Sequence, residues 1–354
     1  NLEQVGSLYR ILKFFGAGRR SMHSIPNVDL AAYRCLPEQS EQRSATLAEL
    51  AYACKDHGFF LLSGHGQDAL IDAMFAQSKW FFDQPKSAKM ALYRDEKNPM
   101  GYFDRELTKQ RRDLKEVFDF KAGGHLSSHP DRQMCWPSAK PEFQTVLSRF
   151  FGQFTMLAQE TITLILTALG LPEIQVDQHV AEAFGERHTS AARLNYYPSQ
   201  DPVPVAQRSG VSALGNMALH HHTDPGALTL LIQDDHGGLQ ARSRLHGWLD
   251  VPPEPGTIVV NIGDVLQVWS NDQCTAGVHR VLPVNSQHGR YSTPFFFQPR
   301  YDALIEPWVE SDQPAHYQPF SWRDYIRGRV TDNFADYGAE DVQIDRYRLT
   351  AAPP

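Results

Sequence analysis

The sequence predicts an α+β protein with a mainly β core, a sandwich or barrel of strands flanked by an N-terminal helical region. Apolar residues in the first half recur at the spacing of amphipathic helices. The second half instead contains short runs of Leu, Val, Ile and Phe bounded by Gly, Pro, Asn and Asp, which is typical of strands. These runs follow one another without alternating helices, which disfavours a parallel α/β sheet.

Three segments of the first half are expected to be helices. Residues 45–56 place Leu50 and Cys54 on one apolar face, and residues 70–82 continue in the same way. A longer helix is expected from about Phe143 to Leu169, where apolar residues again lie near helical spacing.

The second half is expected to form the sheets. Strands are predicted within Gly226–Asp234, Gly256–Gly263 and Thr293–Gln298, and Leu245-His246-Gly247 is predicted as a hairpin turn between two further strands. The composition changes near residue 185 without a linker, so the helical and β parts are expected to form one integrated domain.

Four regions can be assigned along the chain. Residues 25–185 are the mostly helical region, 186–327 the β core, and 328–354 a polar tail or lid. Residues 1–24 carry basic residues and an apolar stripe, which resembles an organelle-targeting helix, although an ordinary amphipathic extension is the preferred interpretation. The expected location is therefore cytoplasmic, with an organelle as the alternative.

Composition excludes several classes of protein. The 354 residues are 42% hydrophobic and 21% charged, which is typical of a globular chain rather than a disordered one. A net charge of −7 argues against a nucleic-acid partner, and no apolar run approaches the roughly 20 residues that a membrane helix needs. The four cysteines are scattered, which argues against a disulfide framework or a thiolate zinc site. A monomer is expected.

Possible metal ligands cluster in the segment from His220 to Asp235, which reads HHHTDPGALTLLIQDD. In an extended segment, residues i and i+2 project to the same side, so His222 and Asp224 can face a common point. His279, in the later segment GVHRVLP, is the natural third ligand. Two histidines and one carboxylate leave coordination positions open, which suits non-haem Fe(II), with zinc as the main competing metal.

The two histidines before His222 need a separate interpretation. His220 and His221 are expected to lie on the surface or around the ligands rather than to bind metal. A shifted register, in which one of them replaces His222 in the triad, is the alternative.

Further motifs occur in a fixed order along most of the chain. They include Ile25-Pro26, His57-Gly58-Phe59-Phe60, His65-Gly66, His222-Thr223-Asp224-Pro225-Gly226, Gly237-Gly238-Leu239-Gln240, Asn261-Ile262-Gly263-Asp264, His279-Arg280-Val281 and Arg290-Tyr291-Ser292. Over about residues 24–327 the chain resembles the isopenicillin N synthase-like family of iron(II)/2-oxoglutarate-dependent dioxygenases. The resemblance implies a double-stranded β-helix (jelly-roll, cupin-like) fold and an iron site made by His222, Asp224 and His279.

Arg290 and Ser292 have the chemistry of a carboxylate site. A guanidinium can fork onto a carboxylate, and a hydroxyl two residues along a strand can add a further hydrogen bond. By resemblance, this pair would hold the distal carboxylate of 2-oxoglutarate, and Asn195 and Tyr197 of the Asn-Tyr-Tyr-Pro segment would contact the same cosubstrate. That segment favours 2-oxoglutarate use, because family members that dispense with 2-oxoglutarate also keep the Arg-x-Ser pair.

The resemblance implies an oxidoreductase of secondary metabolism that uses Fe(II), 2-oxoglutarate and O₂, with ascorbate able to support the reaction. It would hydroxylate, desaturate or cyclise a small organic or amino-acid-derived substrate at an unactivated C–H bond, releasing succinate and CO₂. No catalytic side chain is expected beyond the metal ligands. The alternatives are a 2-oxoglutarate-independent iron oxidase of the same fold and a catalytically silent jelly-roll binding protein.

Other conspicuous residues receive structural interpretations. His57 and His65 are not expected to be ligands, and the charged segment Arg105–Arg112 is expected to be solvated, or alternatively to approach an acidic substrate. Core packing is expected for five aromatic residues that could otherwise line the pocket: Tyr102, Trp269, Phe297, Tyr317 and Trp322.

Overall fold

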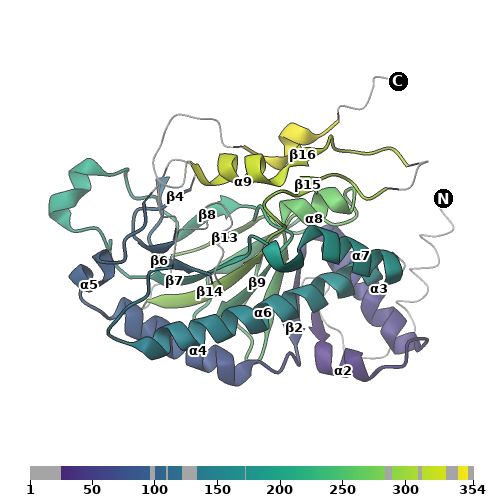
Figure 1. Cartoon of the computed structure of the whole chain (residues 1–354), viewed down its shortest axis with the longest axis horizontal. Coiled ribbons are helices and arrows are strands. Elements are labelled where there is room, and N and C mark those ends of the chain that lie inside the picture. The colour runs from purple at the N-terminus through teal and green to yellow at the C-terminus, as the bar shows by residue number, and fades with distance from the viewer. Residues whose placement is uncertain are drawn as a thin grey trace.

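The computed structural model shows two large sheets, with the long helices on one side of them (Figure 1). It describes residues 25–95, 100–108, 111–121, 134–171, 173–283, 289–309, 313–331 and 342–349. The possible targeting segment, residues 1–24, lies outside the described residues. No helix in the described ranges is long and apolar enough to cross a membrane.

The main sheet has eight strands in the order β1-β2-β12-β9-β14-β7-β6-β3. All its neighbouring strands run antiparallel except β1 and β2. The strands in sheet order are β1 (Asn27–Asp29), β2 (Phe59–Ser63), β12 (Ile258–Ile262), β9 (Leu228–Gln233), β14 (Arg290–Phe297), β7 (Ala191–Tyr197), β6 (Glu116–Phe120) and β3 (Gly101–Phe103).

The smaller sheet has four strands in the order β11-β10-β13-β8. They are β11 (Gly247–Asp250), β10 (Leu239–Ser243), β13 (His279–Val281) and β8 (Leu219–His222). The predicted hairpin turn at 245–247 is confirmed, because it joins β10 to β11. In Figure 1, β8 and β13 lie over β14 and β9, and one cavity is lined by residues of both sheets. This is the jelly-roll arrangement that the sequence predicts.

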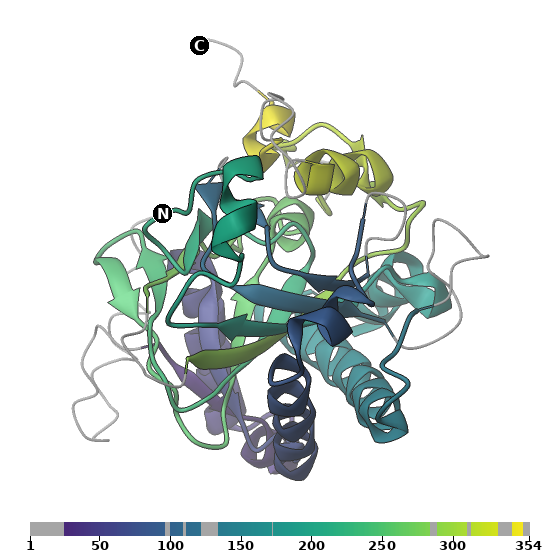
Figure 2. The same cartoon turned by 90° about the vertical axis from the view of Figure 1, so that its left-hand side faces the viewer.

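The long helices cover the outer face of the main sheet (Figure 2). They are α3 (Glu41–Asp56), α4 (Asp68–Phe82) and α6 (Pro141–Ala168), which confirm the three helices predicted from periodicity. A further helix that was not predicted, α7 (Glu173–Ala183), packs against α6. The Ser40 hydroxyl caps α3 by accepting a hydrogen bond from the Arg43 N–H at 3.2 Å, and Pro141 occupies the first position of α6.

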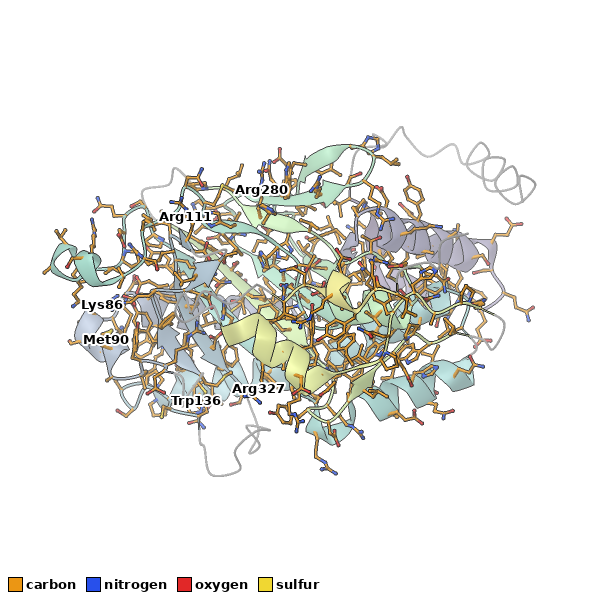
Figure 3. All side chains as sticks on the ribbon, turned by 90° about the horizontal axis from the view of Figure 1, so that it is seen from above. Lys86, Met90, Arg111, Trp136, Arg280 and Arg327 are labelled. Carbon is orange, nitrogen blue, oxygen red and sulfur yellow. The ribbon has the colours of Figure 1, made fainter. Side chains whose placement is uncertain are left out.

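Shorter elements complete the described chain. They are the helices α2 (Leu30–Cys35), α5 (Lys86–Met90), α8 (Asp264–Trp269) and α9 (Trp322–Thr331), the 3₁₀ turns η1 (Gly185–Arg187), η2 (Val205–Gly210) and η3 (Ile344–Tyr347), and the strands β4 (Leu107–Thr108), β5 (Arg111–Arg112), β15 (Leu304–Ile305) and β16 (Phe320–Ser321). Seen from above, Arg327 marks α9 and Arg280 marks β13 of the smaller sheet (Figure 3).

The region 25–185 contributes strands that helical periodicity does not predict. β1, β2, β3 and β6 all belong to the main sheet. β2 reads Phe-Phe-Leu-Leu-Ser and is covered on both faces, so it shows none of the alternation that marks a half-exposed strand. β6 reads Glu-Val-Phe-Asp-Phe, and its acidic residues are buried in ion pairs, so they do not mark a solvent face.

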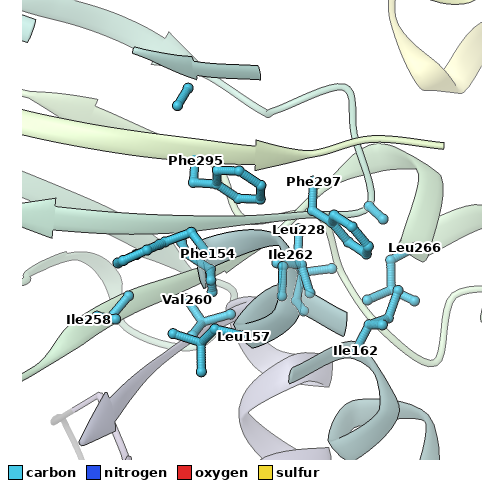
Figure 4. Packing of buried hydrophobic residues seen from close by; sticks show 14 of the residues in the cluster. Phe154, Leu157, Ile162, Leu228, Ile258, Val260, Ile262, Leu266, Phe295 and Phe297 are labelled. Atoms are coloured by element: carbon cyan, nitrogen blue, oxygen red, sulfur yellow. The ribbon is translucent and has the colours of Figure 1, made fainter. Parts of the chain in front are cut away.

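The hydrophobic core lies between α6 and the main sheet. Figure 4 shows Phe154 and Leu157 of α6 against Val260 and Phe295 of the sheet. The ring of Phe154 also stacks on that of Phe150, with 4.0 Å between centroids. Core packing is confirmed for the five aromatic residues named above, which are all buried in this cluster.

Replacing Phe154 with alanine is expected to lower the free energy of unfolding by about 3–5 kcal/mol, because it leaves a cavity in this core. Urea denaturation followed by circular dichroism measures the change. Met156→Ala on the same helix is the control, because the Met156 side chain is 54% exposed and its truncation should cost less than about 0.5 kcal/mol. Equal losses for the two variants would show that Phe154 does not anchor α6.

Candidate active site

The three predicted metal ligands come together at one end of the smaller sheet. His222 ends β8, His279 begins β13, and the two are directly paired across these antiparallel strands. Asp224 lies in the turn after β8, with its Oδ1 3.6 Å from His222 Nε2 and 4.0 Å from His279 Nε2. The three ligand atoms lie within 4.8 Å of one another, so a single metal ion can contact all three.

Backbone carbonyls orient both imidazoles. His222 Nδ1 lies 2.8 Å from the carbonyl oxygen of His220, and His279 Nδ1 lies 3.0 Å from that of Gly277. A carbonyl oxygen can only accept, so each Nδ1 carries the proton and each Nε2 lone pair faces the common point. Burial and the neighbouring His222 lower the pKa of His279 to about 4, so this imidazole is neutral near pH 7, as a metal ligand must be.

The Asp224 carboxylate is held through one oxygen. Its Oδ2 accepts hydrogen bonds from the Thr229 hydroxyl at 2.6 Å and from the Asn261 side-chain amide at 2.8 Å, which leaves Oδ1 to face the histidines. Burial alone would raise the pKa of Asp224, but His279, His222 and the Thr229 hydrogen bond together hold it below the ordinary value. The carboxylate is therefore ionised.

The turn that carries Asp224 is fixed by the start of α8. The N–H of Asp264 donates to the Asp224 carbonyl at 2.9 Å, and that of Val265 donates to the Gly226 carbonyl at 3.0 Å. This close approach requires glycine at residue 263, because a Cβ there would collide with the Gly226 carbonyl oxygen. The sequence Asn-Ile-Gly-Asp therefore positions the metal-facing turn as well as ending a strand.

Thr229 and Asn261 are supporting residues that the sequence analysis did not assign. Each is a polar residue within an otherwise apolar buried strand, β9 and β12 respectively. A buried polar side chain needs a partner. A single polar residue inside an apolar strand segment is therefore the sequence feature from which they could have been predicted.

A cavity of about 830 Å³ opens between the two sheets beside this cluster. Alternate residues of β14 and β7 line it, and the register pairs Arg290 with Tyr197 and Ser292 with Asn195. The four residues predicted to contact 2-oxoglutarate therefore lie side by side on the inner face of the main sheet.

Arg290 is a buried cation without a carboxylate partner among the described residues. Its side chain is fully buried, its Nη2 donates to Gln233 Oε1 at 3.0 Å, and its Nε donates to the His236 carbonyl at 3.4 Å. Its Nη1 has no hydrogen-bond partner in the described part of the chain. Because an uncompensated buried charge is costly, this site fits an anionic ligand.

The residues beside Arg290 also fit a polar ligand. The Asn195 side-chain amide donates to the Ser292 hydroxyl at 3.3 Å, while Asn195 Oδ1 is buried without a partner among the described residues. The Arg290 guanidinium lies over the Tyr197 ring, 5.0 Å from its centroid. The donor set is therefore that of a carboxylate-binding site, and it shares one cavity with the metal-facing cluster.

Comparison with known proteins assigns the family. Residues 188–299 match the family model of the 2OG-Fe(II) oxygenase superfamily, and residues 25–142 match the model described as non-haem dioxygenase in morphine synthesis N-terminal. Gibberellin 20 oxidase 2 of Oryza sativa subsp. indica is 32% identical over 336 residues, which cover 93% of this chain and 80% of the relative. The chain belongs to the 2OG-Fe(II) oxygenase superfamily.

Other members of the superfamily support this assignment. Jasmonate-induced oxygenase 2 of Arabidopsis thaliana is 32% identical over 308 residues, covering 85% of this chain and 78% of the relative. The solved structure of JOX2 with 2OG, Fe and JA has a TM-score of 0.70 at 27% identity, covering 90% of this chain and 91% of that one. The solved structure of the dioxygenase for auxin oxidation in rice has a TM-score of 0.67 at 25% identity, covering 92% of this chain and 100% of that one.

This 2OG-Fe(II) oxygenase is therefore an Fe(II)- and 2-oxoglutarate-dependent dioxygenase with a jelly-roll fold, as the resemblance implies. A role in secondary metabolism is consistent with its plant relatives, which include a flavanone 3-dioxygenase.

The neighbouring histidines do not join the cluster. His220 Nδ1 lies 2.9 Å from Asp113 Oδ1, and the His220 carbonyl accepts a hydrogen bond from His222 Nδ1. His220 therefore orients the His222 ring without facing the other two ligands. His221 lies edge-on to the Trp248 ring. Of the three consecutive histidines, only His222 belongs to the metal-facing cluster among the described residues. Neither His220 nor His221 takes its place.

The expectation of a solvated charged segment at 105–112 agrees with the exposed side chain of Arg111 but is wrong for Glu106 and Arg112. Glu106 and Arg112 are buried. Glu106 accepts from Arg94, Lys115 and Arg193, and Arg112 pairs with Asp201 at 2.6 Å. The charges are compensated by residues distant in the sequence, which local charge patterning cannot show.

The other two assigned histidines are structural. His57 Nδ1 accepts from the Phe59 N–H at 3.2 Å, and His65 Nδ1 accepts from the Gln67 N–H at 3.0 Å. Both contacts lie within the local turns, so neither residue belongs to the metal-facing cluster.

Proposed function

We propose that His222, Asp224 and His279 hold the Fe(II) of this enzyme, and that Arg290, Ser292, Asn195 and Tyr197 bind its 2-oxoglutarate. The enzyme then oxidises an unactivated C–H bond of a small organic or amino-acid-derived substrate by hydroxylation, desaturation or ring closure. The observation that carries this proposal is the fully buried Arg290, which has no carboxylate partner in the described part of the chain and shares a cavity with three converging ligand atoms.

The chain's own residues would position and protect the reaction. When bound, Fe(II) and 2-oxoglutarate supply the oxidising chemistry by reducing O₂, with release of succinate and CO₂. With three protein ligands, a bound Fe(II) would keep coordination positions for 2-oxoglutarate and O₂, and the cavity lies beside these ligands. The cavity walls include Leu231, Pro294 and Phe296, which exclude water from the reacting C–H bond.

The C-terminal residues are proposed to belong to this catalytic unit rather than to a tail. Ile326 and Arg329 of α9, together with Gln343, line the cavity. Arg329 Nη2 donates to the carbonyl of Thr223 at 2.7 Å, directly before Asp224 in the chain. α9 therefore supports the metal-facing turn from the end opposite α8.

The reaction is tested with Fe(II)-loaded protein, 2-oxoglutarate and O₂ against a panel of small organic acids, phenolics and amino-acid derivatives. Succinate release should rise with a true substrate and match the amount of product. Product mass would show a gain of one oxygen for hydroxylation or a loss of two hydrogens for desaturation or ring closure. Product formation without succinate would contradict the proposal and favour an oxidase that does not consume 2-oxoglutarate.

Replacing Thr229 with valine is expected to weaken metal binding about 10- to 100-fold, because Asp224 loses a hydrogen bond that orients it. Titration of the metal-free protein with Fe(II) under nitrogen measures the affinity. Thr145→Val is the control, because Thr145 is exposed on α6 and donates only to its own helix. An unchanged affinity in Thr229→Val would show that this hydrogen bond does not help to hold the ligand.

A further inference from the structure

The cavity contains a second cation that no carboxylate of the described ranges compensates. Lys121 directly follows β6 and lines the cavity. Its ammonium donates to the carbonyl of Thr189 at 2.9 Å and forms no ion pair with any described residue. Burial without an acidic partner lowers the pKa of Lys121 to about 8, so the ammonium is still mostly charged near pH 7.

The other charged residues of β6, β7 and the segments beside them are compensated by ion pairs. Lys115 lies 2.7 Å from Glu106 and 3.3 Å from Asp113, and Arg193 lies 2.6 Å from Asp119. Arg94 also pairs with Glu106 and Asp119. Three cations thus balance three carboxylates, and Lys121 is left outside this network, as Arg290 is.

Lys121 lies too far from Arg290 to serve the same ligand. The register pairs Phe120 of β6 with Ala192 of β7, so Lys121 stands beside Ala191, which in turn pairs with Phe296 of β14. Phe296 is six residues along the strand from Arg290, which is about 20 Å at 3.3 Å per residue. The five-carbon chain of 2-oxoglutarate cannot span that separation.

The same row of residues leads to the metal-facing cluster. Phe296 pairs with Thr229 of β9, and Thr229 donates to Asp224. Lys121 therefore lies level with the metal-facing cluster along the strands, at the end of the cavity that Gln298 and Tyr301 also line and away from Arg290. A substrate group held at this end would not compete with 2-oxoglutarate at Arg290.

We infer that Lys121 binds a carboxylate of the organic substrate, which makes the substrate of this enzyme a carboxylic acid. The inference rests on the proposed function and narrows its substrate class. The ammonium supplies a charge-assisted hydrogen bond at the distal end of the substrate, so it fixes which carbon lies next to the metal without taking part in the oxidation. Lys121 is thus a binding and positioning residue.

The test compares each acid with its uncharged primary amide. The probes are indole-3-acetic acid, jasmonic acid and cinnamic acid, each paired with its amide. Equilibrium dialysis is run on the full chain with Mn(II) and 2-oxoglutarate under nitrogen, so that binding is measured without turnover. Wild type is expected to bind at least one acid about tenfold to a hundredfold more tightly than its amide.

Two variants assign that preference to Lys121. Lys121→Met should abolish the preference and Lys121→Arg should retain it, while Lys55→Met, at an exposed position on α3, should leave it unchanged. The inference is overturned if wild type prefers no acid over its amide, or if Lys121→Met keeps the preference.

The binding of 2-oxoglutarate, measured in the same preparations, separates this inference from the proposed function. Lys121→Met should bind 2-oxoglutarate as wild type does, because Lys121 lies far from Arg290. Weak binding of 2-oxoglutarate by wild type would count against the proposed function. Normal binding of 2-oxoglutarate without an acid preference would count against Lys121 alone.

Discussion

Replacing Asp224 with alanine is expected to abolish stable iron binding and with it all succinate formation. The variant removes the one anionic ligand and leaves two imidazoles, which bind a metal in their uncharged form and so cannot offset the charge of a divalent ion in a buried site. Iron content after dialysis, measured by atomic emission, is expected to fall from about one per chain to a trace. Succinate release should fall to background.

A second cluster on the chain provides a matched control. Asp234, Asp235 and His236 also bring carboxylate and imidazole atoms within 4.8 Å, but Asp235 is exposed. Asp235→Ala should keep both iron and activity. If Asp224→Ala retained iron while Asp235→Ala lost it, the metal centre would lie at the second cluster and the proposed assignment would be wrong.

Replacing Arg290 with methionine is expected to raise the dissociation constant for 2-oxoglutarate at least about a hundredfold. The guanidinium can make two charge-assisted hydrogen bonds to a carboxylate, each contributing about 1.5–3 kcal/mol. Calorimetric titration of 2-oxoglutarate into protein loaded with Mn(II) under nitrogen measures the change. Iron content should stay at the wild-type level, because Arg290 is not part of the metal-facing cluster.

Arg280→Met is the control for this prediction. Arg280 lies on β13 directly after His279 (Figure 3), but its guanidinium lies over the Trp248 ring, 4.1 Å from the centroid, and its Nε donates to Gln240 Oε1. Its removal should leave 2-oxoglutarate affinity within about threefold of wild type. Arg290→Lys should bind less tightly than wild type, because a single ammonium cannot form the bidentate contact. Wild-type affinity in Arg290→Met would contradict the assignment.

Most of the candidate site residues can be predicted from local spacing in the sequence. His222 and Asp224 lie two positions apart in the sequence, as do Arg290 and Ser292, so each pair projects to one side of an extended segment. The pairing of β13 with β8 then brings His279 opposite His222. The long helices are predicted for a similar reason, since α6 keeps its apolar face over its whole length.

Features that depend on distant partners are not visible in the sequence. The segment around Glu106 appears polar, yet Glu106 is buried because Arg94, Lys115 and Arg193 compensate its charge. Lys121 is an ordinary lysine in the sequence. Its significance comes from the cavity beside it and from the lack of an acidic partner among the described residues.

The central claim is that metal and 2-oxoglutarate meet in this one cavity. The most direct measurement is an anaerobic titration of 2-oxoglutarate into the Fe(II)-loaded protein, followed by visible absorption. Chelation of the iron by 2-oxoglutarate produces a weak charge-transfer band, which should appear in wild type and saturate at one equivalent. The band should require far higher 2-oxoglutarate concentrations in Arg290→Met. Bound iron with no band, or a band that Arg290→Met leaves unchanged, would contradict the account.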